Sequence, residues 1–144
     1  MKPARILLLC GSSGSGKTTT LLRLLERLKP LNPDCRGIIC PPGFTNDEKN
    51  FIEIMDVTSG DTRRLAEINN DQTKNLATTR WKLEPNAVDW GNLILQRSTP
   101  CNILFMDEIG PLEFDRGEGL VEGFKAVDLC EYQIALVTIR PSLL

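Results

Sequence analysis

The chain has 144 residues, the length of one ordinary globular domain with a sizeable core. An apolar content of 41% and a charged content of 25% are typical of soluble proteins, and a formal net charge of −2 offers no basic field for nucleic acid. The chain contains no histidine, so it lacks the commonest general base and metal ligand, and acid–base chemistry falls to carboxylates, lysine or water.

Cysteine usage and apolar runs indicate the compartment. Five cysteines, an odd number without a Cys-x-x-Cys pair, favour small buried side chains in a reducing compartment over a disulfide framework or a zinc site. The apolar run near Met1 is too short for a signal peptide, and no run approaches the length that spans a membrane. We therefore expect a cytoplasmic protein without a membrane partner.

The first elements are a strand, a glycine-rich loop and a helix. The continuous apolar run at residues 6–10 predicts a central parallel strand that is covered on both faces. After the loop, apolar residues recur at helical spacing over residues 19–28, and Pro30 ends this helix. A second strand is expected at residues 36–40, which completes a β–α–β unit.

The chain changes character from about residue 44 to residue 83. Two strand-like segments, residues 50–57 and 62–67, flank a turn, and a further short strand is expected at residues 78–83. We interpret this β-rich segment as an antiparallel insert in an α/β core.

Alternating helix and strand patterns return after the insert. A helix opens at Glu84 and ends before Pro100, and an apolar strand at residues 102–106 runs into an acidic pair. A weaker helix is expected at residues 117–129, followed by a last strand at residues 132–139.

Residues 11–18 match G-x-x-x-x-G-K-[ST], the phosphate-binding P-loop. Its glycines let the backbone turn tightly and bring N–H groups onto phosphate oxygens, and the following helix points its positive end at the same phosphates. Lys17 is placed to reach the β- and γ-phosphates, and the Thr18 hydroxyl to ligate Mg²⁺. A Rossmann loop is excluded because Thr19 stands where its third glycine is needed. The expected phosphate-binding residues are Gly11, Ser12, Ser13, Gly14, Ser15, Gly16, Lys17, Thr18 and Thr19.

The acidic pair Asp107 and Glu108 follows an apolar strand, which is the Walker B arrangement. We expect Asp107 to hold the Mg²⁺ shell, directly or through water, and Glu108 to accept a hydrogen bond from the attacking water and orient it. The P-loop and this pair both follow strands, at the edge where open α/β sheets bind ligands. Lys17 and Glu108 are the predicted catalytic residues, and Thr18 and Asp107 the predicted metal ligands.

Two further roles stay open. Thr138, at the end of the last strand, is either a sensor of the γ-phosphate or an ordinary strand threonine. An additional cation for the transition state could come from one of several arginines, although Lys17 is the only cation that the motif assigns. The candidates are Arg63, Arg64, Arg80, Arg116 and Arg140.

Residues 107–113, Asp-Glu-Ile-Gly-Pro-Leu-Glu, resemble the Asp-Glu-Ile-Gly-x-(Met/Leu)-Glu signature of the small cancer-related nucleoside triphosphatases, and the order of elements is similar over nearly the whole chain. The resemblance implies an α/β P-loop NTPase fold, a RecA-like, mostly parallel sheet flanked by helices, with an antiparallel β insert. It also implies slow, Mg²⁺-dependent hydrolysis of nucleoside triphosphates with broad base tolerance. The nucleotide roles of the family fall on Gly11, Gly16, Lys17, Thr18, Asp107 and Glu108, and Glu113 also belongs to the signature.

The chain departs from this family in two places. Residues 47–51 stand where the family has an acidic-to-basic stretch that leads to Arg-x-Gly-Phe. The family also continues beyond the strand at residues 132–139 with another helix and usually a strand. We interpret residues 1–144 as a single P-loop NTPase domain, with its β-rich insert at about residues 44–83 and a C-terminus truncated relative to the family.

The leading prediction is hydrolysis of a nucleoside triphosphate, such as ATP or GTP, to diphosphate and phosphate, by a monomer with Mg²⁺ as cofactor. Two alternatives stay open: a P-loop kinase that transfers the γ-phosphate to a small acceptor, and a non-catalytic nucleotide-binding switch.

Overall fold

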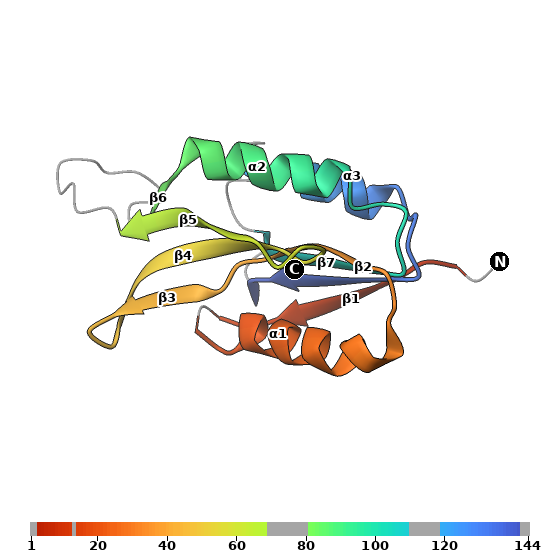
Figure 1. Cartoon of the computed structure of the whole chain (residues 1–144), viewed down its shortest axis with the longest axis horizontal. Coiled ribbons are helices and arrows are strands. Elements are labelled where there is room, and N and C mark those ends of the chain that lie inside the picture. Colours follow the sequence, from red (N-terminus) through yellow and green to blue (C-terminus); the bar gives the residue numbers. More distant parts are fainter. Residues whose placement is uncertain (1–2, 13, 69–80, 110–118, 142–144) are drawn as a thin grey trace.

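One mixed sheet with helices on both faces makes up the computed structural model, which describes the chain apart from residues 1–2, 13, 69–80, 110–118 and 142–144 (Figure 1). The strand order is β1-β8-β7-β2-β4-β5-β6, with β3 paired to β4. The strands are β1 (Arg5–Cys10), β2 (Cys35–Ile39), β3 (Pro42–Thr45), β4 (Glu48–Asp56), β5 (Thr62–Ile68), β6 (Trp81–Leu83), β7 (Ile103–Ile109) and β8 (Ile134–Ile139). The helices are α1 (Lys17–Leu28), a 3-10 turn η1 (Lys29–Leu31), α2 (Pro85–Gln96) and α3 (Glu122–Asp128).

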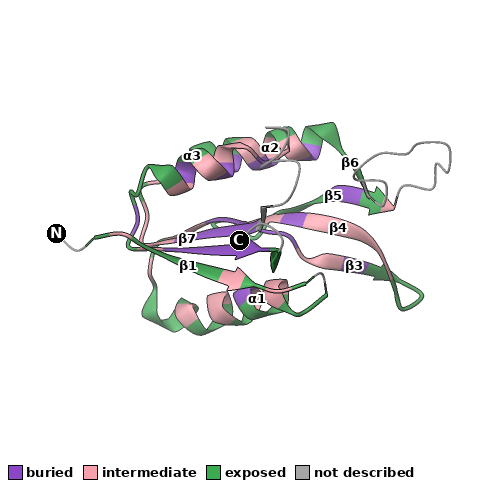
Figure 2. Ribbon diagram, turned by 180° about the vertical axis from the view of Figure 1, so that it is seen from behind, coloured by how far each residue is buried: buried purple, intermediate pink, exposed green. Residues whose placement is uncertain are grey.

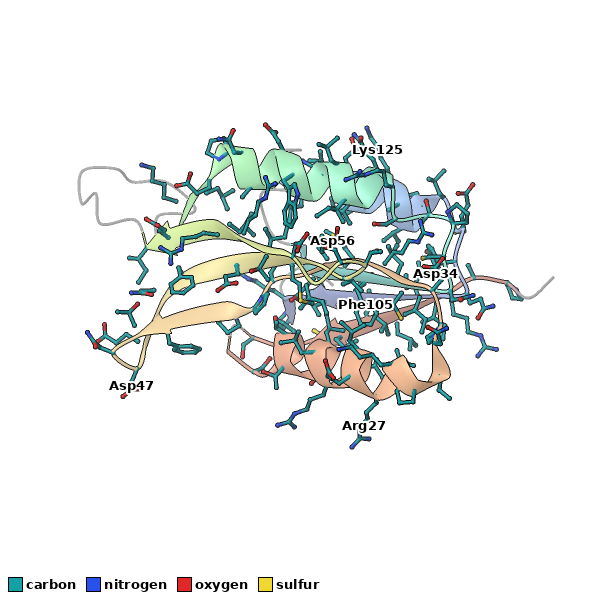
Figure 3. All side chains as sticks on the ribbon, in the orientation of Figure 1. Arg27, Asp34, Asp47, Asp56, Phe105 and Lys125 are labelled. Atoms are coloured by element: carbon teal, nitrogen blue, oxygen red, sulfur yellow. The ribbon has the colours of Figure 1, made fainter. Side chains whose placement is uncertain are left out.

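The helices form two layers around the sheet, as the sequence predicts for an α/β fold. Helix α1 covers one face, and α2 and α3 cover the other (Figure 1). On the α1 face, Leu21 packs with Ile39, Phe105 and Leu136, and Figure 3 shows Phe105 between the sheet and α1. The opposite face has its own cluster of buried side chains, which includes Ile38, Ile54, Leu95, Leu104 and Met106. No helix in the described part of the chain is long and apolar enough to cross a membrane.

Strands β7 and β8 confirm the expected buried strands. They pair in parallel, and β7 also pairs in parallel with β2. Residues 104–107 of β7 and residues 135–139 of β8 are buried, because helices cover both faces of this part of the sheet (Figure 2).

Strand β1 corrects one prediction. It forms where expected and pairs in parallel with β8, but among the described strands it stands at the end of the order and not at its centre. The exposed fractions of Ile6, Leu7 and Leu8 are 48%, 50% and 53%. A continuous apolar run shows that a strand favours burial, but it does not identify the neighbour that supplies it. This mismatch between sequence and environment recurs below.

The predicted antiparallel insert is present as β4, β5 and β6. The last expected strand covers residues 78–83, and residues 78–80 of it lie outside the described residues. The insert extends the main sheet, since Ile38 and Ile39 of β2 pair with Asp56 and Met55 of β4. Strand β3 lies where no strand is expected from the sequence, because proline is depleted in strands. A proline is tolerated at the first position of an edge strand, which is where Pro42 lies.

The helices and cysteines depart from the sequence predictions in small ways. Helix α3 begins at Glu122, later than the predicted residue 117, although residues 117 and 118 lie outside the described part. All five cysteines are free thiols, but Cys10 and Cys130 are exposed and not buried as expected. Burial raises the pKa of Cys101 to about 11, which keeps this thiol protonated at neutral pH.

Gly37 permits the close contact between β2 and β7. It has a φ of +110°, and a Cβ added there would lie 2.0 Å from the carbonyl oxygen of Phe105. Gly37→Ala should therefore lower the free energy of unfolding by roughly 3 kcal/mol or more, since both strain and a clash with backbone result. Gly60→Ala is the matched control, because Gly60 also has a positive φ, +81°, but nothing lies within 4 Å. It should cost only about 1–2 kcal/mol. Urea unfolding measures both, and equal losses would contradict the clash.

Candidate active site

The loop between β1 and α1 is shaped by two glycines. Gly14 and Gly16 have φ values of +80° and +96°, in the left-handed region that other residues rarely adopt. Gly16 is the residue that precedes α1, and no side chain caps the helix there. The first turn of α1 also contains no acidic residue. The N–H groups at this helix end therefore remain available to an anion.

The Lys17 ammonium folds back over the loop. Its Nζ donates to the carbonyl oxygen of Gly11 and, at 3.4 Å, to that of Ser12. Among the described residues, no carboxylate forms a salt bridge with Lys17. An ammonium held by neutral carbonyls retains its full charge for a ligand in the loop.

Asp107 is the buried centre of the site, with an exposed fraction of 0%. Its Oδ2 accepts hydrogen bonds from Thr18 Oγ1 at 2.8 Å and from the backbone N–H of Cys40 at 3.0 Å. Its Oδ1 accepts one from Thr138 Oγ1 at 2.5 Å. The start of α1, the end of β2 and the end of β8 thus converge on one carboxylate of β7.

The strand order explains how this convergence arises. Strand β8 lies between β1, which leads into the P-loop, and β7, which carries Asp107. Thr18, in the first turn of α1, therefore reaches across β8 to Asp107. Thr138 is buried in the intervening strand and positions Asp107, a contact that neither sequence interpretation of this threonine includes. The Cys40 N–H was also missed, because a backbone donor leaves no signal in residue type.

The structure describes some of the other predicted site residues and leaves others outside the described part. Glu108 follows Asp107 in β7, but its side chain lies outside the description, as does Ser13. Thr19 is exposed in the first turn of α1. Glu113 also lies outside the described residues.

Two of the three candidate arginines in the described part of the chain contact other side chains. Arg63 lies over the Trp90 ring at 4.5 Å on the α2 side. Arg64 lies over the Phe51 ring at 4.0 Å and bonds to Glu67 at 3.1 Å. Arg140 is exposed just after β8, and Arg80 and Arg116 lie outside the described residues.

The oxygen donors of Thr18 and Asp107 suit Mg²⁺, which prefers oxygen ligands and is usually held by one or two protein groups together with phosphate. No group of three or more Cys, Asp or Glu side chains in the described part could hold a metal by itself. The Thr18 proton is donated to Asp107, so the lone pairs of its Oγ1 remain available to a cation. The residues present therefore fit a metal that is shared with a phosphate ligand.

Strand β1 leads through a glycine-rich loop into α1, and β7, which carries Asp107, lies two strands away from β1 in the sheet. This arrangement defines the P-loop NTPase class of α/β proteins. The family model described as NTPase matches residues 6–136. The chain belongs to this NTPase family.

Curated relatives agree with this assignment. The chain is 30% identical over 112 residues to the nucleoside-triphosphatase THEP1 of Saccharolobus solfataricus, a match that covers 78% of this chain and 63% of the relative. It is also 30% identical to the protein of that name from Ignicoccus hospitalis, over 74% of this chain and 60% of the relative. The matches thus span less than two thirds of the length of these relatives.

A solved structure shares the fold. The solution structure of a human cancer-related nucleoside triphosphatase aligns with a TM-score of 0.70, over 95% of this chain and 76% of that chain, at 19% identity. At this identity the likeness concerns the fold alone.

Thr138→Val tests the support of Asp107. The change keeps the shape of the side chain but removes the donor to a buried carboxylate, so the free energy of unfolding should fall by about 1–3 kcal/mol. Thr138→Ser retains the hydroxyl and should lose only about 1 kcal/mol for the missing methyl group. Urea unfolding of the three proteins measures the difference. A Thr138→Val curve that overlays the wild-type curve would show that the bond does not stabilise the site.

Proposed function

We propose that this chain hydrolyses nucleoside triphosphates to nucleoside diphosphate and phosphate with the help of Mg²⁺. The observation that carries the proposal is the hydrogen bond from Thr18 to Asp107, because it joins the phosphate loop to the acidic strand. The curated relatives bear the name nucleoside-triphosphatase, which supports the same chemistry.

The loop accounts for phosphate binding. The left-handed conformation at Gly16 turns the chain into α1 so that the N–H groups of its first turn face the loop. Lys17 exchanges its bonds to the loop carbonyls for bonds to the β- and γ-phosphate oxygens. These groups recognise the triphosphate and not the base, which is consistent with broad base tolerance.

Thr18 and Asp107 would hold Mg²⁺, and the ion, when bound, neutralises charge on the β- and γ-phosphates. The protein contributes the orientation of the Thr18 hydroxyl. Asp107 accepts its proton, and the bonds from Thr138 and Cys40 keep the carboxylate in place. The site is thus assembled before a ligand enters, which avoids reorganisation when the reaction occurs.

Glu108 supplies the group that distinguishes hydrolysis from binding. It follows Asp107 in β7, at the edge of the sheet where the phosphate loop lies. A carboxylate there accepts a hydrogen bond from a water molecule and orients it in line with the bond from the γ-phosphorus to the leaving oxygen. Water attacks phosphorus, the bond from phosphorus to the β-phosphate oxygen breaks, and the proton lost by the attacking water passes to the Glu108 carboxylate, which returns it to the released phosphate.

The first experiment is product analysis of the purified chain with each of four nucleoside triphosphates and Mg²⁺. Free phosphate and nucleoside diphosphate in equal amounts are expected for each. Phosphate transferred to an added nucleoside or metabolite would indicate a kinase, and tight binding without turnover would indicate a switch.

Glu108→Gln should lower turnover by about 10²–10⁴-fold, because the amide cannot take the place of the carboxylate toward water. Nucleotide affinity should change little, since the phosphate loop is intact. Phosphate release measures the first quantity, and titration with a fluorescent nucleotide measures the second. Glu131→Gln, at an exposed position, is the matched control. Unchanged turnover in Glu108→Gln would contradict the role of this residue.

Lys17→Ala should weaken nucleotide binding by about 10- to 100-fold, which corresponds to the loss of a charged hydrogen bond. Lys29→Ala is its control, because Lys29 is exposed and pairs with Glu26 on the surface. The same fluorescent titration measures both affinities. Equal nucleotide affinities of the Lys17→Ala and Lys29→Ala proteins would contradict a role of Lys17 in phosphate binding.

A further inference from the structure

Arg140 follows the strand that separates the phosphate loop from the acidic strand. Strand β8 ends at Ile139 and lies between β1 and β7 in the sheet. It pairs with β1 in unbroken register as far as Cys10 and Ile139, and the N–H of Gly11 then donates to the carbonyl oxygen of Ile139 at 3.4 Å. The ladder therefore continues by one residue and sets Gly11, the first residue of the phosphate loop, opposite Arg140.

On its other side, β8 loses its regular register with β7 at the acidic pair. The register shifts between Met106 and Ile109, so residues 107 and 108 both stand opposite Thr138. A bulge of this kind is common next to active sites, where it changes the direction of a side chain. Arg140 comes two residues after Thr138, about 7 Å further along the strand. It therefore lies just beyond the acidic pair and beside the start of the phosphate loop.

Alternation along β8 places Arg140 on the face of the sheet that α1 covers. Leu136 belongs to the core cluster of that face, and Thr138 donates its hydroxyl proton to Asp107. Every second side chain of a strand lies on the same face, so Arg140 is the next member of this row. Pro141 follows, and a residue before proline favours the extended backbone that continues the row. The row thus leads from the core, past the buried carboxylate, to a cation.

The other two candidate arginines in the described part of the chain are less well placed. Arg63 lies over the Trp90 ring, on the opposite side of the sheet from the phosphate loop. Arg64 is paired with Glu67 at 3.1 Å. Arg140 is exposed and forms no ion pair with any carboxylate that the structure describes. Its guanidinium is therefore available to an anionic ligand at the phosphate loop.

We propose that Arg140 binds the γ-phosphate of the nucleoside triphosphate and stabilises the negative charge that develops on it during hydrolysis. The inference rests on the proposed function, in which Lys17 holds the β- and γ-phosphates and Glu108 orients the attacking water. The γ-phosphate then lies between the phosphate loop and the acidic strand. The long side chain of Arg140 reaches this space from the end of the strand between them.

The chemistry of the guanidinium suits this position. It is planar, it keeps its charge at every pH at which the protein is folded, and its paired N–H groups match two oxygens of a phosphoryl group. Arg140 donates hydrogen bonds only, and the proton of the attacking water still passes to Glu108. The charge of Arg140 adds to that of Lys17, so the phosphoryl oxygens are bound by cations from both sides of β8.

Binding without turnover tests the contact with the γ-phosphate. The β,γ-imido analogue of ATP and, separately, ADP are titrated into each protein by calorimetry in the presence of Mg²⁺. Arg140→Ala should weaken binding of the analogue by about 10- to 100-fold, the loss of a charged hydrogen bond, and that of ADP by no more than about twofold. Arg27→Ala is the matched control, because Arg27 is exposed in the last turn of α1 and points away from the sheet (Figure 3). Circular dichroism checks that each variant is folded.

Turnover tests the contribution to the reaction. Arg140→Ala should lower the rate of phosphate release at saturating nucleotide by about 10³-fold, the lower end of the effect of a transition-state arginine. Arg140→Lys should fall between the variant and the wild type, because lysine keeps the charge but not the paired N–H groups. Guanidinium chloride, at concentrations too low to unfold the protein, should restore part of the turnover of Arg140→Ala and none of that of Glu108→Gln.

These measurements separate the two proposals. A wild-type protein that binds the analogue but releases no phosphate would refute hydrolysis, and the binding comparison would still decide on Arg140. An unchanged ratio of analogue affinity to ADP affinity in Arg140→Ala would overturn the assignment of Arg140, even if turnover were lost, since the residue would then act without contact to the γ-phosphate. A wild-type protein that binds neither nucleotide would overturn both proposals.

Discussion

The carboxylate of Asp107 is the constraint around which the site is built. A buried, charged oxygen pair is costly unless hydrogen-bond donors surround it, and Thr18, Thr138 and the Cys40 N–H provide them. Each donor belongs to a different part of the fold: the first turn of α1, β8 and the end of β2. The requirement to satisfy one side chain therefore fixes the phosphate loop relative to three strands of the sheet.

Because β8 lies between β1 and β7, the hydrogen bond from Thr18 to Asp107 spans the width of one strand. If β7 lay directly beside β1, no strand would separate them, and the site would lack the Thr138 hydroxyl that β8 provides. Thr18 has a structural role and a binding role: its hydroxyl proton is donated to Asp107, while the lone pairs of its oxygen remain available to a cation. The geometry of binding and the stability of the core thus share the same hydrogen bonds, so substitutions at Thr138 affect the site from within the fold.

Sequence reasoning predicted the local parts of this protein better than the pairings. The P-loop and the acidic strand end were found because their chemistry depends on short spacings and on residue type. The Cys40 N–H and the position of β8 could not be found, because backbone donors and strand order leave no pattern in one sequence. Arg63 lies on the α2 side of the sheet because it pairs with Ile54, which belongs to the core cluster of that face, and this pairing is likewise invisible in the chain. The cytoplasmic location stays a prediction.

The mismatch at β1 follows from the same limit. A continuous apolar run indicates that a strand favours burial, and residues 6–10 are as apolar as the strands at the centre of the sheet. In β7 and β8 the fold supplies the cover, whereas in β1 it leaves residues 6–8 about half exposed. Because β1 leads directly into the phosphate loop at Gly11, its parallel pairing with β8 also holds the start of that loop against the sheet.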